Sequence, residues 1–373
     1  MEELYIRLVV YSFYSFSAIQ FFFLGIFFAR MVFIKPKKKD IDVNQEGVSV
    51  VISAKNEYLR LKKYLPKILE QNHPNFEVIV VNDSSTDETE YLLKELKTKY
   101  AHLSYLNVQS GVNFFKGKKF PLSMGIKSAK NDLLLLTDAD CWPASEHWIT
   151  EMQSAYHSNT EIVLGYGAYE RKKGLLNKII RYDTLRVAIA YFSFATWGMP
   201  YMGVGRNLSY RKNLFYTQKG FMSHYNISSG DDDLFVNKAA TRKNTKVVLS
   251  ANAKTISLPK KTFGAWVNQK RRHLTTGIQY KKWHLIFLGL WESSTFFFYL
   301  LGILLIVFKI NLIIIGSFIA VRIVLHLIIT KKFMIIHNER KLLLISPLIE
   351  IFIVVFMPLL NLSNSLYKQR KWK

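Results

Sequence analysis

Apolar residues follow two different patterns along the chain. Four long runs that carry almost no charge lie towards its two ends, at residues 9–34, 285–308, 310–330 and 342–362. Each run is close to the length that an α-helix needs to cross a bilayer. Between the first run and the second, short apolar runs alternate with stretches of helical spacing. The pattern therefore predicts an α/β domain that is flanked by N- and C-terminal transmembrane helices.

The middle region alternates between strand and helix patterns. We expect strands at 48–54, 76–83, 103–108 and 133–138, and helices at 57–71, 87–100 and about 121–129. Such alternation requires crossover connections, which make a sheet mostly parallel. The last of these strands begins with four leucines, as expected for a central strand covered on both faces. Ser85 and Glu88, three residues apart, predict a capping box at the start of the second helix.

Polar and acidic residues stand where three of these strands end. They are Asn56 and Glu57, Asp83 and Asp87, and Asp138 and Asp140. Because ligands of open α/β sheets bind beyond the carboxyl ends of the strands, this edge is the candidate site. Two close carboxylates repel each other unless a cation lies between them, and their oxygens suit Mg²⁺ or Mn²⁺. A solvated turn would also explain Asp138 and Asp140, and a helix N-cap would also explain Asp87.

Five motifs occur in a fixed order across residues 48–283: "VISAKNE", "VIVVNDSSTDET", "GKKFPLSMGIKSAKNDLLLLTDAD", "SGDDDLFVNKA" and "QKRRH". Together they resemble the integral-membrane branch of the family 2 glycosyltransferases, and the flanking apolar runs match the same branch. The resemblance implies a GT-A fold, a nucleotide-sugar donor and a divalent metal, Mg²⁺ or Mn²⁺. We expect a UDP-sugar as the donor, because the family's acid at the position of Asp83 usually contacts uracil.

The resemblance also implies roles for individual residues. It assigns donor binding to Ala54, Asn56, Glu57, Asp83, Lys118, Asp138, Gln269 and Arg272. Asp138 matches the acid near the ribose and Asp140 matches the metal ligand, so we place both acids in the metal site. Asp232 matches the family's general base, and Asp231 is the acid beside it. His273 stands where the family's QxxRW motif has tryptophan, which argues against a processive, cellulose-like activity.

The chemistry of sugar transfer suits these residue types. A departing nucleoside diphosphate gains negative charge, which a metal at Asp140 and the cation of Arg272 would stabilise. Asp232 would take the proton of the acceptor hydroxyl, and a single displacement would invert the anomeric carbon. Repulsion within Asp231–Asp233 should raise a carboxyl pKa towards neutrality. A charged start of a helix would also explain the cluster, and we expect Asp233 to be structural.

Two further segments belong to the predicted site. Residues 198–212, "GMPYMGVGRNLSYRK", resemble the family's segment on the acceptor side, and Gly203 and Gly205 there allow close approach of the backbone. Residues 262–284 predict a basic amphipathic helix at the membrane surface. We expect this helix to present Gln269 and Arg272 to the site and to place Trp266 at headgroup depth.

Charge and cysteine content indicate where the protein works. The net charge is +24 at pH 7, and basic residues flank the apolar runs at 35–40 and 280–284. By the positive-inside rule, both ends of the middle region face the cytosol. The charge suits anionic lipids and an anionic substrate, and we do not expect nucleic acid as a partner. The single cysteine, Cys141, excludes an internal disulfide and fits a reducing compartment.

The topology of the C-terminal end has two solutions. Four full crossings would place the basic tail after residue 366 outside the cytosol, against the positive-inside rule. Residues 342–362 are therefore either re-entrant or interfacial, or they are an exception to the rule. We expect two or three spans in the C-terminal region.

Five parts of the chain follow from these patterns: an anchor at 1–34, a basic linker at 35–47, a GT-A domain at 48–261, an interfacial helix at 262–284, and a C-terminal transmembrane region with a basic tail at 285–373. We expect a multi-pass protein of the cell membrane with a cytosolic catalytic domain. It would transfer sugar, with inversion, to a lipid-linked or envelope glycan acceptor. The alternatives are a processive polysaccharide synthase and an inactive scaffold that binds sugar nucleotides in the membrane.

Overall fold

The chain folds into two compact units. The computed structural model describes residues 2–34, 46–109, 111, 117–227 and 229–366. The first unit combines residues 1–35, 178–193 and 280–369, and the second combines residues 36–177, 194–279 and 370–373. Most of the predicted basic linker (35–45) and the end of the basic tail (367–373) lie outside the described residues.

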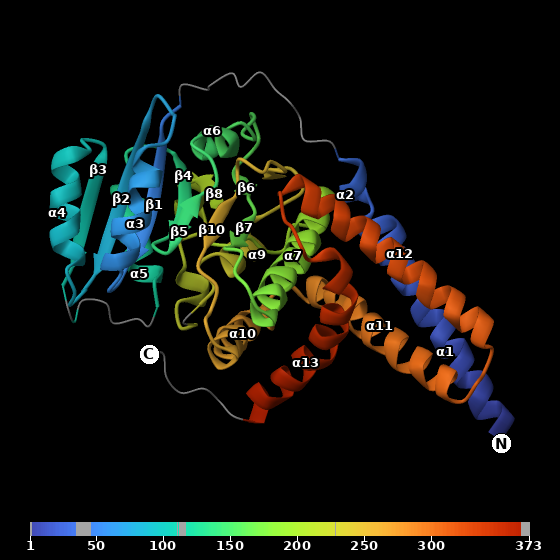
Figure 1. Cartoon of the computed structure of the whole chain (residues 1–373). Helices are drawn as coiled ribbons and strands as arrows, with labels where there is room; N and C mark the ends of the chain where they lie inside the picture. The colour runs from blue at the N-terminus through green and yellow to red at the C-terminus, as the bar shows by residue number, and fades with distance from the viewer. Residues whose placement is uncertain (1, 35–45, 110, 112–116, 228, 367–373) are drawn as a thin grey trace. The chain divides into compact units, whose positions relative to one another are not determined.

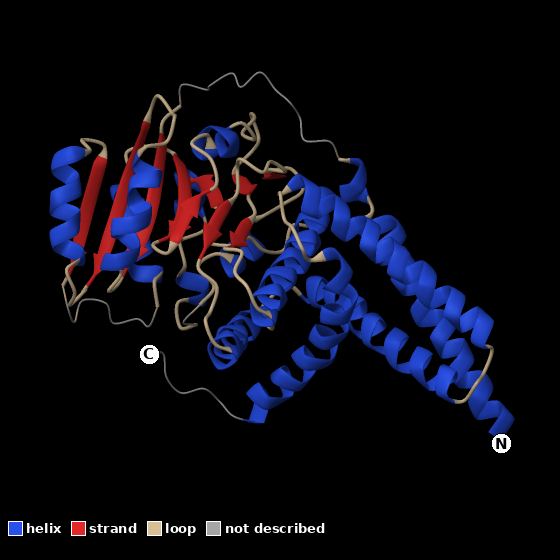
Figure 2. Ribbon diagram, in the orientation of Figure 1, coloured by secondary structure: helices blue, strands red, loops and turns tan. Residues whose placement is uncertain are grey.

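The described part of the first unit is helical (Figures 1 and 2). Its elements are α1 (Glu2–Phe22), the π-helix η1 (Phe23–Phe28), α2 (Arg30–Phe33), most of α7 (Leu175–Thr196), α11 (Lys282–Val307), α12 (Leu312–Ile336), the 3₁₀-helix η3 (Leu343–Ile345) and α13 (Ser346–Leu366). Four stretches are long and apolar enough to cross a membrane: Glu3–Phe33, Lys282–Val307, Leu312–Ile336 and Leu343–Asn364. They coincide with the four apolar runs of the sequence.

The second unit contains a seven-stranded, mostly parallel sheet (Figure 2). Its order is β3 (Leu103–Val108), β2 (Phe76–Asp83), β1 (Val48–Ala54), β4 (Leu133–Asp138), β8 (Leu208–Arg211), β6 (Ile162–Leu164) and β9 (Thr245–Val247). Only β8 runs antiparallel to its neighbours β4 and β6. In register, Ala54 of β1 pairs with Asn82 of β2, and Ser53 pairs with Asp138 of β4. Three predicted strands therefore end at one edge, as the sequence indicated.

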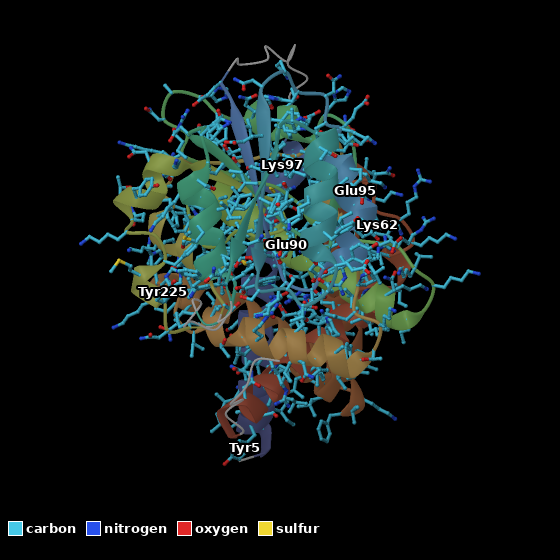
Figure 3. The ribbon with its side chains drawn as sticks, turned by 90° about the vertical axis from the view of Figure 1, so that its left-hand side faces the viewer. Tyr5, Lys62, Glu90, Glu95, Lys97 and Tyr225 are labelled. Atoms are coloured by element: carbon cyan, nitrogen blue, oxygen red, sulfur yellow. The ribbon has the colours of Figure 1, made fainter. Side chains whose placement is uncertain are left out.

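Helices cover both faces of the strands β1, β2 and β4. They belong to a set that comprises α3 (Tyr58–Leu69), α4 (Thr89–Lys99), α5 (Lys119–Ser128), α6 (Trp148–Gln153), α8 (Lys212–Thr217), α9 (Asp233–Ala239) and α10 (Phe263–Gly277). Apolar side chains of α3, α4 and α6 share one core with alternate residues of β1. Helix α5 lies so close to the other face that a Cβ on Gly125 would stand 2.6 Å from Val51. Figure 3 labels charged residues on the outer sides of α3 and α4, including Lys62 and Glu95.

A second, smaller sheet has three strands of three residues each. It consists of β5 (Cys141–Pro143), β10 (Thr255–Ser257) and β7 (Gly167–Tyr169), with β10 in the middle. Ser257 of β10 pairs with Cys141 of β5 and, on its other side, with Tyr169 of β7. The sequence pattern did not predict this sheet. Its strand β5 begins directly after Asp140 in the chain, so the sheet borders the candidate site.

The predicted capping box at Ser85 and Glu88 is wrong. Helix α4 begins at Thr89, and its cap residue Glu88 makes no side-chain cap bond. The backbone N–H of Thr89 instead donates to Asp87 Oδ1 at 3.1 Å. Ser85 Oγ accepts a bond from the backbone N–H of Asn56 at 2.8 Å, so a tertiary contact occupies the hydroxyl that would have capped the helix.

The predicted interfacial helix at 262–284 is shorter than expected, and one of its tryptophans is not at the surface. Helix α10 begins after the N-cap Thr262, whose side chain accepts from the N–H of Ala265, and it ends at Gly277. The glycine and the threonines before it are poor helix formers, which explains the break. Trp266 is 1% exposed and packs against Phe263, so its place at headgroup depth is not borne out.

Candidate active site

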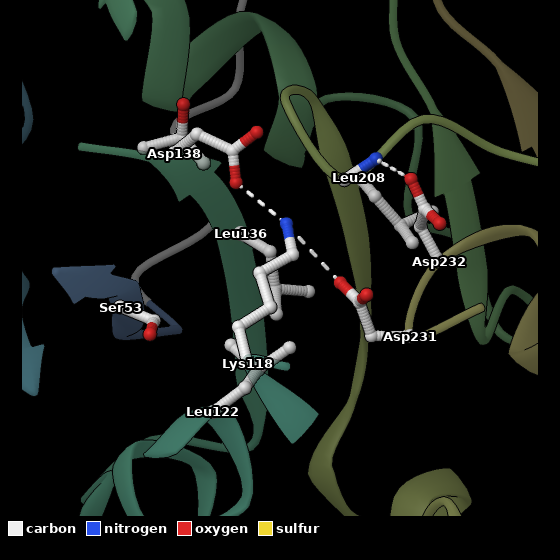
Figure 4. A pocket seen from close by; sticks show the side chains of 10 residues that line it. Ser53, Lys118, Leu122, Leu136, Asp138, Leu208, Asp231 and Asp232 are labelled. Atoms are coloured by element: carbon white, nitrogen blue, oxygen red, sulfur yellow. Dashed lines mark hydrogen bonds and ion pairs between the residues drawn. The ribbon is translucent and has the colours of Figure 1, made fainter. Parts of the chain in front are cut away.

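The candidate site is a pocket where side chains from β4, α5 and the start of α9 converge (Figure 4). Lys118, the residue before α5, lies between two carboxylates. Its Nζ is 2.7 Å from Asp138 Oδ1 and 3.2 Å from Asp231 Oδ2. Ser53, Gly205 and Asp232 also line the pocket. Four residues predicted for the site, Lys118, Asp138, Asp231 and Asp232, are thus brought together from three distant parts of the chain.

Asp232 has the properties of a base that works near neutral pH. It is the N-cap of α9, and its carboxylate accepts the N–H of Asp233 at 2.8 Å and the N–H of Gly205 at 2.6 Å. A Cβ on Gly205 would stand 3.2 Å from Asp232 Oδ2, so the glycine permits this approach. Burial, followed by the negative charges of Asp231 and Asp233, raises the pKa of Asp232 to about 7, although Lys118 opposes the shift. The expected repulsion within the cluster is confirmed.

Asp233 is held by structural contacts. Its Oδ2 accepts a hydrogen bond from Thr276 Oγ1 at 2.5 Å, and its Oδ1 accepts the N–H of Leu234 at 2.8 Å. Thr276 lies in the last turn of α10. The carboxylate therefore joins the start of α9 to the end of α10, as expected of a structural residue.

Asp138 and Asp140 can hold a divalent metal. Ligand atoms of Asp138, Asp140 and Cys141 lie within 4.8 Å of one another. Burial raises the pKa of Cys141 well above its usual range, so the thiol keeps its proton and donates to Asp140 Oδ1 at 3.5 Å. Burial and the charge of Asp138 also raise the pKa of Asp140. Two carboxylates that repel each other fit a hard cation that completes its shell with water and phosphate oxygens.

The ends of β1 and β2 are joined by a network of turn contacts. Asn56 adopts a left-handed conformation (φ 54°), and its side-chain oxygen accepts the N–H of Thr86 at 2.8 Å. Asp87 accepts the N–H of Tyr58 at 3.1 Å. Asp87 is not itself the N-cap of either α3 or α4, since those residues are Glu57 and Glu88, but its carboxylate accepts N–H groups at both helix starts. Glu57 forms an ion pair with Arg60 at 2.6 Å.

Ala54 and Asp83, also predicted for donor binding, lie at the same edge. Both are buried at the ends of their strands, with Ala54 1% and Asp83 6% exposed. They lie at the predicted edge, and neither lines the pocket around Lys118.

Helix α10 carries the two remaining predicted residues. Gln269 Nε2 donates to the hydroxyl of Tyr169 in β7 at 2.9 Å. Arg272 lies near enough to Asp138 for its charge to help lower the pKa of that acid, after burial, which raises it, and Lys118, which lowers it. The helix therefore reaches both the small sheet and the acidic edge.

A protein-family model matches the middle region of this chain. The model of glycosyl transferase family 2 matches residues 49–228. Residues 49–228 therefore form a glycosyl transferase family 2 domain. The match covers the family 2 motifs up to Asp140 and the glycines before β8, and it ends before Asp231, Asp232, Gln269 and Arg272.

Known structures and relatives agree with the family 2 assignment. The mannosyltransferase PcManGT from Pyrobaculum calidifontis, solved in complex with GDP-Man and Mn²⁺, aligns over 97% of this chain and 100% of its own, with a TM-score of 0.60 and 15% identity. At that identity the likeness establishes the GT-A fold. A 4,4'-diaponeurosporenoate glycosyltransferase from Staphylococcus haemolyticus is 32% identical over 32% of this chain and 31% of its own length.

Two further relatives are named for other reactions. A beta-monoglucosyldiacylglycerol synthase from Nostoc sp. is 30% identical over 33% of this chain and 27% of its own. A poly-beta-1,6-N-acetyl-D-glucosamine synthase from Staphylococcus aureus is 30% identical over 28% of this chain and 24% of its own. The matched stretch thus spans less than a third of each of these three relatives.

Sequence reasoning missed one charged residue at the edge of the family 2 site. Arg206 follows Gly205 directly, and its guanidinium lies 4.2 Å from the ring of Tyr169. Its charge, with that of Lys118, helps to lower the pKa of Asp138 against the effect of burial. The sequence did carry a signal for this residue: Arg206 follows Gly203 and Gly205, in the segment that we assigned to the acceptor side.

Proposed function

We propose that this protein is a membrane-bound, inverting, metal-dependent glycosyltransferase. It moves a sugar from a nucleotide-sugar donor, a UDP-sugar, to a lipid-linked or envelope glycan acceptor. The observation that supports this most directly is the pocket itself. In it, Asp232 with a pKa of about 7 faces the same space as Lys118 and Asp138. A base beside a cation and a metal-binding edge is the combination that sugar transfer from a diphosphate requires.

In the proposed reaction, Asp232 is the base. Its carboxylate is fixed by the N–H of Gly205, which leaves the acceptor hydroxyl to approach from the pocket. Asp232 accepts the hydroxyl proton while the oxygen attacks the anomeric carbon on the face opposite the leaving diphosphate. Lys118 holds Asp138 and Asp231 in place and supplies positive charge next to the leaving group. A divalent ion on Asp138 and Asp140, Mg²⁺ or Mn²⁺, would neutralise the diphosphate.

The membrane location and the acceptor belong to the same proposal. Four helices have the length and composition of membrane spans, so we infer a multi-pass protein. Basic residues flank the predicted domain on both sides, which orients it to the cytosol. By their names, one relative glycosylates 4,4'-diaponeurosporenoate and another makes beta-monoglucosyldiacylglycerol. A lipid-linked acceptor suits an active site that is anchored to the bilayer.

The experiment is a donor titration on detergent-purified, full-length protein. UDP, GDP, CDP and their sugars are titrated with and without Mn²⁺, and slow donor hydrolysis is followed. We expect metal-dependent binding of one nucleotide, with UDP favoured, and its loss in Asp83→Ala and Asp140→Ala. Asp132→Ala is the control. Asp132 lies just before the start of β4, at the end of the strand away from Asp138, and it pairs with Arg211 at 2.8 Å. If one nucleotide binds but no sugar is hydrolysed or transferred, the inactive sugar-nucleotide-binding scaffold becomes the better description, and if no nucleotide binds, a membrane scaffold without donor binding does.

A further inference from the structure

Arg206 is anchored to the small sheet by three contacts. Its Nη1 donates to the backbone oxygen of Ala168 at 3.0 Å and to Ser257 Oγ at 2.9 Å. Its guanidinium carbon lies 4.2 Å from the centre of the Tyr169 ring. Such stacking and bonding fix the plane of a guanidinium group.

The same contacts place Arg206 beside the acidic edge. Ser257, which accepts from the guanidinium, pairs with Cys141, and Cys141 directly follows Asp140. The backbone oxygen of Arg206 accepts from Thr137 Oγ1 at 2.9 Å, and Thr137 directly precedes Asp138. Both ends of the residue are therefore tied to neighbours of the two metal-site carboxylates.

Gly167 of the small sheet lies close against the side chain of Arg206. A Cβ on Gly167 would stand 3.2 Å from Arg206 Cβ and 3.4 Å from its Cζ, so glycine at 167 makes space for the arginine. Tyr169, on which the guanidinium stacks, accepts a hydrogen bond from Gln269 of α10. Gln269 of α10 thus fixes the Tyr169 side chain on which Arg206 stacks.

Two of the three nitrogen atoms of the Arg206 guanidinium, Nε and Nη2, make no hydrogen bond among the described residues. The two bonds to the small sheet both leave from Nη1. Nor does Arg206 form an ion pair with a carboxylate among the described residues, unlike Arg60 or Arg211. Asp138 and Asp140 act on Arg206 through their charge and without an ion pair. A fixed, partly buried guanidinium of this kind suits an anionic ligand that is planar or tetrahedral, such as phosphate.

We propose that Arg206 binds the diphosphate of the donor through Nε and Nη2, and that the sheet β5–β10–β7 is the cradle that orients it. The proposal rests on the proposed function and assigns a phosphate ligand that the motifs did not contain. When the bond between the anomeric carbon and the phosphate oxygen breaks, its electron pair stays on that oxygen. Arg206 would stabilise the added charge, while the proton of the acceptor hydroxyl goes to Asp232.

The test compares nucleoside diphosphates with monophosphates. Binding of UDP and UMP, and of GDP and GMP, to full-length protein is measured with Mn²⁺ by calorimetry. In Arg206→Met we expect diphosphate affinity to fall about ten- to a hundredfold, the scale of charged hydrogen bonds, and monophosphate affinity to change much less. Because Arg206→Met also removes two bonds to the small sheet, Arg206→Lys is measured alongside. Lysine keeps the positive charge but lacks the paired N–H donors of the guanidinium group, so we expect an intermediate loss of diphosphate affinity.

Arg211→Met is the matched control. Arg211 ends the same strand β8 that Arg206 precedes, and it pairs with Glu46 and Asp132, each at 2.8 Å. It should leave the ratio of diphosphate to monophosphate affinity unchanged. Equal losses for both nucleotides in Arg206→Met, or no loss, would overturn the assignment and leave the proposed function standing. Wild-type protein that binds no nucleotide at all would overturn both.

Discussion

The two units of the chain treat buried charge in opposite ways. In the first unit, Arg322 of α12 donates to Glu350 of α13 at 2.7 Å and to Tyr299 and Gln20 at 2.5 and 3.1 Å. Arg322 is 1% and Glu350 3% exposed. In the second unit, Asp231–Asp233 are three adjacent carboxylates. Asp231 forms an ion pair with Lys118 at 3.2 Å, whereas Lys118 and Lys119 act on Asp232 through their charge and without an ion pair.

The contrast separates a structural use of charge from a chemical one. A buried cation with its own anion joins helices α12 and α13 and has no charge left for a ligand. A buried cluster with excess negative charge is costly on its own, and such cost is usual where groups must take protons or bind cations. We therefore expect mutations in the first cluster to change stability, and mutations in the second to change catalysis and binding.

The largest effect is expected for Asp232→Asn. The amide cannot accept the acceptor's proton, so the rate of sugar transfer should fall by about 10²- to 10⁴-fold. Nucleoside diphosphate binding should persist, because the N–H of Gly205 can still bond to the amide oxygen. Transfer rate and nucleotide affinity are measured on the same preparation. A parallel loss of affinity would make Asp232 a ligand and not a base.

Next comes Arg322→Met in the first unit. The change leaves the buried carboxylate of Glu350 without its cation, which should lower the free energy of unfolding by about 3–5 kcal/mol. The double variant Arg322→Met/Glu350→Leu should recover most of this loss. Denaturant unfolding in detergent provides the measurement. Arg7→Met is the control, because the Arg7–Glu3 pair on α1 is exposed and should contribute less than about 1 kcal/mol.

The structural interpretation of the Arg322 cluster has a clear counter-result. If the double variant were as unstable as Arg322→Met alone, the loss would come from packing and not from an uncompensated charge. If either variant retained its fold but lost sugar transfer, the cluster would have a chemical role, and the contrast between the units would fail.

A smaller effect is expected for Lys118→Met. Removal of the ammonium group that bonds Asp138 and Asp231 should weaken binding of the nucleoside diphosphate by about tenfold, the value of one charged hydrogen bond. Lys130→Met serves as the control, because Lys130 belongs to the same sequence motif as Lys118 and is exposed. Unchanged diphosphate affinity in Lys118→Met would limit the lysine to a structural role between the two acids.

Sequence reasoning located the main strands because their burial is a local property. The predicted strands 48–54, 76–83, 103–108 and 133–138 coincide with β1, β2, β3 and β4 residue by residue. Each is an apolar run long enough to show its pattern. The meeting of Asp138 with the ends of β1 and β2 followed from the parallel order, since strand ends meet at one edge. The place of Lys118 near them came from the resemblance to the family.

What the sequence could not supply depends on pairing across the fold. Three-residue strands such as β10 carry no periodicity, so the small sheet was missed, and with it the anchoring of Arg206 by Ser257. Ser85 looked like a cap because the contact with Asn56 is tertiary. The raised pKa of Asp232 results first from burial, which the sequence does not show, and then from Asp231 and Asp233, while Lys118 and the N–H of Gly205 oppose it.

The smallest expected effect concerns the pH dependence of sugar transfer, which tests the chemical role of the Asp231–Asp233 cluster. Burial, Asp231 and Asp233 raise the pKa of Asp232 to about 7. Because the base acts only when ionised, kcat/KM should rise with pH and level off above about pH 7.

Asp233→Asn removes one of the neighbouring charges and should move the midpoint of this rise to lower pH by less than about one unit, since one unit corresponds to ~1.4 kcal/mol of interaction. Thr276→Val is the matched control, because it removes the 2.5 Å hydrogen bond to Asp233 and leaves the charge. An equal shift in Thr276→Val would trace the effect to the position of α9. An unmoved midpoint in Asp233→Asn would mean that burial and Asp231, without Asp233, raise the pKa of Asp232.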